Sequence, residues 1–401
     1  MIGFAQQRGT DVAGKHYGQT VERIIIMPHD ETHGMSTRSV HAGWEPDPAT
    51  GAVKRPLVMA NSYAVPSDGN YDETLYGYAR DLNPNARWLE ERLLALEGGE
   101  DCVVTASGVS AINGTFLALL SAGDHLICSD IAYISVRTML LEHFPRRFGI
   151  QTTLLDTSDP EVVQAAIQPN TKLIHVETPG NPTTRISDIA AIAAIAHAHG
   201  ALLSVDSTWS GLTTQSPLAL GADLVEHSIS KYINGHGDAL GGAVFGKKSL
   251  LDVIRKFVVK DMGACISPFN AWQIMRGVAT LPIRMERHNA NAMQVAQFLE
   301  TAPGVAWVRY PGLKSHPNHA VAAQQMQGFS GMLNFDLVDP RKRAAFVAQL
   351  KLFVHAVSLG HDESLIFVYN DYNGHEFFRV SIGIEDASDL IADITQALAH
   401  I

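Results

Sequence analysis

From about residue 84 onward the chain alternates between two hydrophobic patterns. In residues 84–98 apolar side chains recur every three or four positions and a glycine follows, which predicts a helix that ends at Gly98. Later runs are apolar throughout, at 101–107, 125–130, 152–156, 172–178, 201–207 and 222–230. Helical patterns separate most of these runs, at 108–123, 160–167 and 186–200. This succession is typical of an α/β fold with a mainly parallel sheet, covered by helices on both faces.

The two ends of the chain have different patterns. Residues 1–60 are polar, rich in Gly and Pro and without periodicity, so we expect an irregular N-terminal arm that packs on another part of the protein or on another subunit. Residues 271–300 have a long helical pattern, and the segment from Gly331 to the C-terminus indicates a small α+β unit. We therefore expect an arm at 1–60, a large domain at 61–255 and a small domain at 256–401.

Composition narrows the class of protein. A chain of 401 residues with 46% apolar residues is long enough for two or three packed units. The formal net charge of −11, without clustered Lys and Arg, argues against a nucleic-acid-binding protein. Three cysteines are too few for a disulfide framework, and no run approaches the roughly 20 apolar residues of a membrane span. No signal peptide is evident at the start, so we expect a soluble cytoplasmic protein without a membrane partner.

Three predicted strands end in chemically distinctive residues. In an open parallel sheet, ligands bind at the carboxyl ends of the strands. Residues 107–109 form one such end, where a strand turns into a helix whose free N–H groups suit a phosphate. Asp206 forms the second, and Ser228, Ser230 and Lys231 form the third. Because Ser228 and Ser230 are two positions apart, a strand would direct both hydroxyls to one side.

Together these residues suit pyridoxal 5'-phosphate (PLP). The lysine would form a Schiff base with the cofactor, and the carboxylate would hold the pyridine nitrogen protonated so that the ring accepts electrons. Each residue alone is common at a turn or on a surface, and only their joint placement at three strand ends favours the cofactor. The 18 histidines show no metal-ligand spacing, so we expect no metal site.

At this point the chain is identified as resembling the Cys/Met-metabolism group of fold-type-I PLP enzymes. The group includes cystathionine γ-synthase, cystathionine lyases, methionine γ-lyase and O-acylhomoserine sulfhydrylase. The resemblance runs from residue 36 to residue 386. Its motifs, in chain order, are "STRSVHAGWEPDPATGAV", "YARDLNP", "TASGVSA", "ETPGNPT", "VDST", "HSISKYINGHGD", "VSLGHDESLI" and "RVSIGIED".

The resemblance implies a cofactor site. Lys231 is similar to the Schiff-base lysine that also serves as general base, and Asp206 is similar to the pyridinium partner. Tyr133 matches a tyrosine that stacks on the cofactor ring and can act as acid or base. The implied phosphate ligands lie at two strand ends, namely Ser107, Gly108, Val109, Ser228 and Ser230.

The resemblance also implies a substrate site and an assembly. Arg379 matches the arginine that grips the substrate's α-carboxylate with its planar fork, and Ser358 lies beside it. Asn181 matches a residue near the ring's 3-oxygen and the substrate. Tyr78 and Arg80 match residues that reach the cofactor of a neighbouring subunit. The implied unit is at least a dimer and usually a homotetramer, a dimer of dimers.

The implied reaction is γ-elimination from an amino acid with sulfur or oxygen at Cγ, as in methionine γ-lyase. The γ-replacement transferases and the cystathionine lyases use the same residues and stay open as alternatives, as does a catalytically inactive relative. Cystathionine-handling members often have a glutamate at the positions of Val357 and Gly77, and an arginine at that of Thr138. Methionine γ-lyases usually have Gly-Cys after the stacking tyrosine, where this chain has Ile134 and Ser135.

Acidic residues suggest a specialised substrate. The segment between Ser358 and Arg379 is shorter than in most relatives, and it contains Asp362, Glu363, Asp371 and Glu376. A further acidic residue, Asp81, follows Arg80. If these carboxylates surrounded the entrance they would favour a cationic side chain, such as the guanidino-oxy group of canavanine. The alternative is that they are ordinary solvated loop carboxylates.

Overall fold

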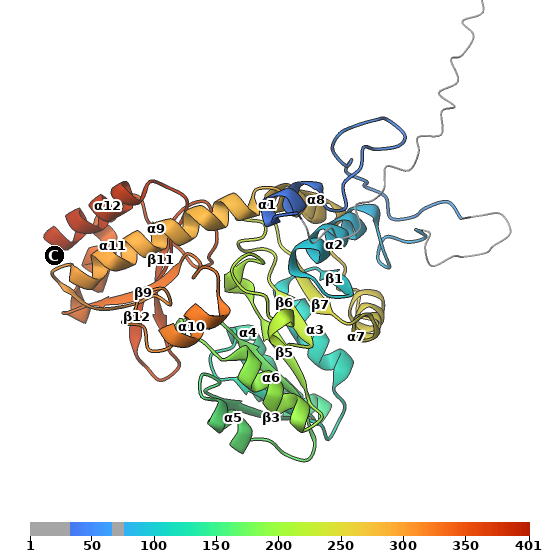
Figure 1. Ribbon diagram of the computed structural model, residues 1–401, viewed down its shortest axis with the longest axis horizontal. Helices are drawn as coiled ribbons and strands as arrows, with labels where there is room; N and C mark the ends of the chain where they lie inside the picture. Colours follow the sequence, from blue (N-terminus) through green and yellow to red (C-terminus); the bar gives the residue numbers. More distant parts are fainter. Residues whose placement is uncertain (1–32, 66–75) are drawn as a thin grey trace, which may run out of the picture.

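The computed structural model describes residues 33–65 and 76–401 (Figure 1). The first 32 residues of the expected arm therefore lie outside the described part of the chain. Within the described part, a seven-stranded sheet forms from residues 101–246 and a five-stranded sheet from residues 305–381.

The larger sheet has the order β1-β7-β6-β5-β4-β2-β3. Its strands are β1 (Asp101–Thr105), β2 (His125–Ser129), β3 (Gln151–Leu155), β4 (Thr171–Glu177), β5 (Leu202–Asp206), β6 (Leu224–His227) and β7 (Gly242–Gly246). The strands β2 to β6 pair in parallel, and β7 is antiparallel to both of its neighbours. The expected mainly parallel sheet is thus confirmed, with β7 inserted between β1 and β6.

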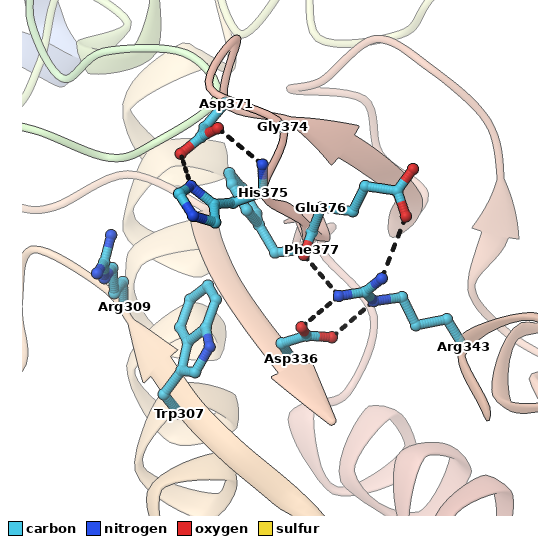
Figure 2. A pocket seen from close by; sticks show the side chains of 9 residues that line it. All are labelled: Trp307, Arg309, Asp336, Arg343, Asp371, Gly374, His375, Glu376 and Phe377. Atoms are coloured by element: carbon cyan, nitrogen blue, oxygen red, sulfur yellow. Dashed lines mark hydrogen bonds and ion pairs between the residues drawn. The ribbon is translucent and has the colours of Figure 1, made fainter. Parts of the chain in front are cut away.

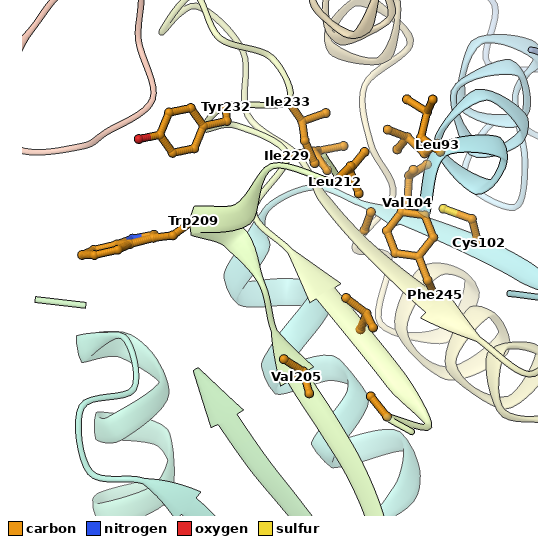
Figure 3. Packing of buried hydrophobic residues seen from close by; sticks show 14 of the residues in the cluster. Leu93, Cys102, Val104, Val205, Trp209, Leu212, Ile229, Tyr232, Ile233 and Phe245 are labelled. Carbon is orange, nitrogen blue, oxygen red and sulfur yellow. The ribbon is translucent and has the colours of Figure 1, made fainter. Parts of the chain in front are cut away.

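Helices cover both faces of this sheet. Figure 3 shows part of one core, where Leu93 of α2 (Pro84–Glu97) and Phe245 of β7 lie among buried side chains. The same core includes Ile189 and Ile192 of α6 (Ile189–Ala198). On the other face, α3 (Gly108–Leu119) and α7 (Lys248–Ile254) bury Ala111 and other apolar residues against β1, β6 and β7. Because successive side chains of a strand point to opposite faces, β1 contributes Cys102 and Val104 to the first core and Val103 to the core on the other face.

The strand expected over 222–230 is shorter than its hydrophobic run. β6 pairs with β5 up to Asp206 and with β7 up to His227, and there it ends. The Ser228 N–H donates to the Thr208 hydroxyl (2.8 Å) instead of to a strand, and a turn follows. The prediction that Ser228 and Ser230 belong to the strand is therefore wrong, because Ser228 follows its last residue and Ser230 lies in the turn, although both line the same cavity.

The smaller sheet has the order β10-β11-β12-β9-β8. Its strands are β8 (Val305–Arg309), β9 (Met332–Leu337), β10 (Val354–His355), β11 (Leu365–Asn370) and β12 (Glu376–Ser381). The 21-residue helix α9 (Leu281–Thr301) joins the two units, since Met285 packs in the first core and Val295 in the second (Figure 1). With α11 (Arg343–Gln349) and α12 (Ala387–Ala399), this sheet forms the expected small α+β unit.

The remaining helices are short. They are α1 (Met35–His41), α4 (Ile134–Thr138), the π-helix Met139–Phe148, α5 (Pro160–Ala165), the 3-10 turns Thr208–Ser210 and Leu218–Leu220, the π-helix Arg255–Asp261, α8 (Pro268–Val278), α10 (His319–Gln325) and the 3-10 turn Pro340–Lys342. The exact domain boundaries stay a prediction. Among the described residues, no helix combines the length and apolarity that crossing a membrane would need.

Candidate active site

A cavity of about 510 Å³ lies between the two sheets, and we call it the inter-sheet cavity. Its walls come from the carboxyl ends of β4, β5 and β6, from the start of α3, and from the segment before β11 together with β12. Among the described residues, eleven of the thirteen predicted site residues line it, namely Ser107, Gly108, Val109, Tyr133, Asn181, Asp206, Ser228, Ser230, Lys231, Ser358 and Arg379.

The start of α3 meets the turn after β6 at very short range. Ser107 caps the helix, because its hydroxyl accepts a hydrogen bond from the Ser110 N–H (3.2 Å). A Cβ atom at Gly108 would lie 2.6 Å from the Ser228 Cβ, so only glycine fits there. The first N–H groups of a helix have no intrahelical acceptor, which leaves those of Gly108 and Val109 to a ligand.

Three buried carboxyl groups lie side by side at the ends of three strands. Glu177 pairs in register with Asp206, and Asp206 pairs with Glu226. Burial raises the pKa of all three, and Asp206 raises the pKa of Glu177 and Glu226 further. The Thr208 N–H (3.0 Å) and hydroxyl (2.5 Å) both donate to Asp206 Oδ1 and favour its charged form. A cationic ligand group in the cavity would favour it further.

Lys231 follows Ser228 in a turn closed by its own N–H, which donates to the Ser228 carbonyl (3.1 Å). Its Nζ atom donates to the Ser358 hydroxyl (2.7 Å), so the lysine spans from one unit to the other. Burial, and then the Arg379 charge, lower the pKa of Lys231 to about 8. About a tenth of the amine is therefore neutral at pH 7, far more than for a free lysine, and the neutral amine is the form that a base or nucleophile needs.

Arg379 on β12 is 4% exposed and held from three sides. Its Nη1 donates to Asn181 Oδ1 (2.8 Å), its Nη2 donates to the Ser358 carbonyl (2.6 Å), and its guanidinium stacks 3.9 Å from the Tyr369 ring centre. The buried Nε has no hydrogen-bond partner among the described residues. A buried donor without a partner is costly, so this atom suits an anionic ligand group.

The two serines that follow β6 differ in what their side chains contact. The Ser230 hydroxyl donates to the Gly241 carbonyl (3.2 Å) and accepts from the Gly241 N–H (3.0 Å), which ties the turn to the chain before β7. Ser228 lies against the start of α3. Tyr133 precedes α4 and remains 43% exposed, and its N–H donates to Glu177 (2.8 Å).

Tyr78 and Arg80 do not line the inter-sheet cavity of their own chain. Tyr78 is 43% exposed, and the Arg80 guanidinium lies 5.1 Å from its ring centre. The Arg80 side chain is half-exposed, with a 3.5 Å ion pair to Asp81. Both side chains are thus placed on the surface, at a distance from the other predicted residues of this chain.

The acidic residues expected at the entrance lie elsewhere. None of Asp81, Asp362, Glu363, Asp371 and Glu376 lines the inter-sheet cavity within the described chain. Asp371 and Glu376 face a separate hollow of about 560 Å³ on the small unit (Figure 2).

Charges in that separate hollow are paired with one another. Asp371 pairs with His375 (3.0 Å), and Arg343 lies between Asp336 (2.5 Å) and Glu376 (3.2 Å), as Figure 2 shows. The carboxylates of this hollow are therefore paired with basic side chains, and Asp371 and Glu376 do not line the inter-sheet cavity.

Several lining residues were missed in the sequence. Glu177 ends an apolar strand as Asp206 does, so the rule that singled out Asp206 could have found it. Tyr369 and Tyr372 come from the β11–β12 hairpin, and Arg137 stacks 4.2 Å from the Tyr372 ring centre. No local pattern marks these aromatic residues, because what brings them to the cavity is the packing of one unit against the other.

The donor set fits PLP on three grounds. Unpaired N–H groups at the start of a helix suit a phosphate, a buried carboxylate whose charged form accepts hydrogen bonds from Thr208 suits a pyridinium, and an amine with lowered pKa suits an aldehyde. All three occur in one cavity with a buried arginine that can hold a carboxylate.

Comparisons with known proteins agree with this fit. A family model described as Cys/Met metabolism PLP-dependent enzyme matches residues 36–399. The chain is 44% identical over 384 residues to canavanine gamma-lyase of Pseudomonas canavaninivorans, covering 90% of this chain and 96% of that protein. It is 39% identical over 392 residues to L-methionine gamma-lyase of Treponema denticola, covering 92% and 97%.

A solved structure supports the same relationship. The crystal structure of metB from Corynebacterium glutamicum has a TM-score of 0.88 and 39% identity, covering 92% of this chain and 98% of that one. The match of fold and sequence extends over both sheets and over the cavity between them. The chain therefore belongs to the Cys/Met metabolism family of PLP-dependent enzymes.

Proposed function

We propose that this enzyme is a γ-lyase that eliminates a sulfur or oxygen substituent from Cγ of an L-amino acid, with canavanine as its preferred substrate. One observation carries the proposal. Lys231, Asp206 and Arg379 converge on one cavity in a chain that is 44% identical to a canavanine gamma-lyase. The similarity to an L-methionine gamma-lyase supports the same reaction class.

The cofactor would be held by groups from the large sheet. The N–H groups of Gly108 and Val109 would bind its phosphate together with the serines at 107, 228 and 230. Asp206 would pair with the pyridine nitrogen, and Tyr133 would stack on the ring. Lys231 would hold the cofactor covalently.

When bound, PLP acts as an electron sink that makes the protons at the substrate's Cα and Cβ removable. Lys231 Nζ, with its pKa of about 8, would take these protons, because its neutral form is far more populated near neutral pH than that of a free lysine. The Arg379 guanidinium would hold the α-carboxylate and Asn181 would fix that guanidinium, so the Cα–H bond points to the lysine. Tyr133 would donate a proton to the leaving group.

The distal wall of the cavity argues against cystathionine as the main substrate. Val357, Ile134 and Leu240 line this side and are 58%, 51% and 63% exposed, so an apolar surface faces the space beyond the reacting carbons. The distal amino acid of cystathionine carries both an ammonium and a carboxylate group, and these three side chains offer neither group a polar partner.

We further propose that Tyr78 and Arg80 complete the site of a neighbouring subunit. Both are exposed in the single chain and lie outside its own cavity, although the family resemblance places them at a cofactor. A homodimer with shared sites, doubled to a homotetramer, would use them. A cytoplasmic location stays a prediction.

A substrate panel tests the reaction. Purified enzyme is given canavanine, methionine, homocysteine, cystathionine or O-acetylhomoserine, and both 2-oxobutanoate and homoserine are quantified, with Lys231→Ala as the inactive control. Preferred turnover of canavanine supports the proposal. Vigorous turnover of methionine or O-acetylhomoserine with none of canavanine contradicts it. Adding a thiol separates the alternative, γ-replacement, because a transferase then yields a new thioether.

A further inference from the structure

A series of contacting side chains leads from Lys231 away from the inter-sheet cavity. Lys231 Nζ donates to Ser358 Oγ (2.7 Å), and Ser358 Oγ lies 3.1 Å from His361 Nε2. His361 does not line the cavity, and its side chain is 21% exposed. On its far side His361 Nδ1 is 3.9 Å from a Glu363 oxygen, and the Glu363 side chain is 59% exposed. This series of side chains thus runs from the buried amine to solvent.

The backbone conformation at Ser358 fixes the middle of this series of side chains. Ser358 has a φ of +87°, a conformation that a side chain rarely adopts. In this conformation its carbonyl accepts from Arg379 while its hydroxyl faces Lys231. The cost of such strain indicates that the position of Ser358 is over-determined by its surroundings.

The glycine-rich turn after Lys231 makes room for the histidine ring. A Cβ atom at Gly237 would lie 2.7 Å from His361 Cε1, and Gly237 has a φ of +65°. Any side chain there would displace the ring. The turn and the histidine are therefore complementary, although 361 and 237 lie on different units of the fold.

Charged groups face His361 from two elements. Burial and the Lys231 charge lower its pKa, whereas Glu363, Asp362 and Asp238 act in the opposite direction. The ring is thus mainly neutral at and above neutral pH, with Nε2 available as an acceptor for the Ser358 hydroxyl.

From this geometry we propose that His361 is a positioning residue that acts on Lys231 through the Ser358 hydroxyl and receives a proton from it. This inference rests on the proposed role of Lys231 as the base. When the Lys231 ammonium gives a proton to Ser358 Oγ, the hydroxyl gives its own proton to His361 Nε2. The lysine becomes neutral, Ser358 is unchanged, and the imidazolium passes its proton to water beside Glu363. Charge and protons balance without a further reactant.

The test compares His361→Ala, His361→Gln, Ser358→Ala and the double variant Ser358→Ala/His361→Ala with wild type. His375→Ala is the matched control, because that histidine lies on the same unit and pairs with Asp371 at the separate hollow. Two quantities are measured against pH, namely kcat and KM for γ-elimination, and the rate at which added PLP rebinds to cofactor-free enzyme. Rebinding is followed by visible absorbance and requires no turnover.

His361→Ala is expected to lower kcat by about 10²-fold, the lower range for loss of proton transfer, with little change in KM. It also changes the pH profile, because the part of the fall of kcat at low pH that protonation of His361 causes in wild type is lost and only the part due to Lys231 remains. His361→Gln keeps an acceptor for Ser358, so PLP rebinding returns toward the wild-type rate while kcat stays low. The double variant is no worse than Ser358→Ala, because both act through one path.

Three results would overturn the proposal. They are an unchanged pH profile of kcat in His361→Ala, an effect equal to that of His375→Ala, and additive losses in the double variant. Failure of the proposed function is a different outcome, in which wild type eliminates nothing from any substrate. The rebinding series then still decides the role of His361, because it follows the reaction of the Lys231 amine with PLP and requires no turnover.

Discussion

Replacing Gly108 with alanine should weaken PLP binding far more than it weakens the fold. The new Cβ would lie 2.6 Å from Ser228 Cβ and 2.9 Å from Ser228 Cα. Carbon atoms pack at about 3.5–4.0 Å, so the start of α3 and the turn after β6 must separate by about 1 Å. The obstacle is partly backbone, so no rotation of a side chain relieves it.

Overpacking of this kind costs about 1–3 kcal/mol. If this cost falls on the PLP-bound form of the enzyme, the dissociation constant for PLP rises by about 5- to 150-fold. The assay is a titration of cofactor-free enzyme with PLP, followed by absorbance, together with Tm measured with and without PLP.

Gly114→Ala is the matched control, because it lies in the same helix and has an equally close contact. Its Cβ would lie 2.7 Å from Val258 Cγ1, on the side of α3 that faces α7 and the adjoining π-helix. We expect a similar loss of Tm with unchanged PLP affinity. Equal affinity losses in both variants, or a Gly108→Ala enzyme that binds PLP as wild type does, would refute the reasoning.

Four further outcomes are expected. Arg379→Ala should raise KM about 10- to 150-fold with a smaller change in kcat, since about 1.5–3 kcal/mol of charged hydrogen bonding is lost; an unchanged KM would contradict its role. Lys231→Ala should lose both turnover and the covalent PLP absorbance, and retention of either would contradict the assignment. The rate of PLP rebinding should rise with pH and level off above about 8, because the amine reacts only when neutral; a rate independent of pH between 6 and 9 is the contrary result. Mixing inactive Lys231→Ala with Arg80→Ala should restore activity through hybrid dimers, whereas sites built within one chain would stay inactive.

Local patterns in the sequence predicted much of this protein. The alternation of strands and helices was readable because the strands of the large sheet other than the edge strand β3 are mostly buried and because each helix buries one stripe. Asp206 and Lys231 were found because parallel strands deliver their last residues, and the turns that follow them, to one edge of the sheet. The helix start at 107–109 was found for the same reason.

Tertiary structure decided what those patterns could not. Lys231 meets Ser358 across 127 residues, and Arg379 meets Asn181 across 198, so no local spacing reports these contacts. The acidic residues after Ser358 suggested a charged entrance, yet Asp371 and Glu376 face the separate hollow.

His361 is the clearest example of a residue whose role depends on tertiary structure and not on a local pattern. In the sequence it follows a glycine in a polar loop, and only the packing of the small unit on the large one brings it within reach of Ser358 and leaves it room beside Gly237. The sequence by itself determined the elements and the cofactor-binding strand ends, because burial and turn chemistry act over a few residues. The tertiary structure alone decided the rest of the site, because the approach of two separately folded surfaces depends on the shapes of both.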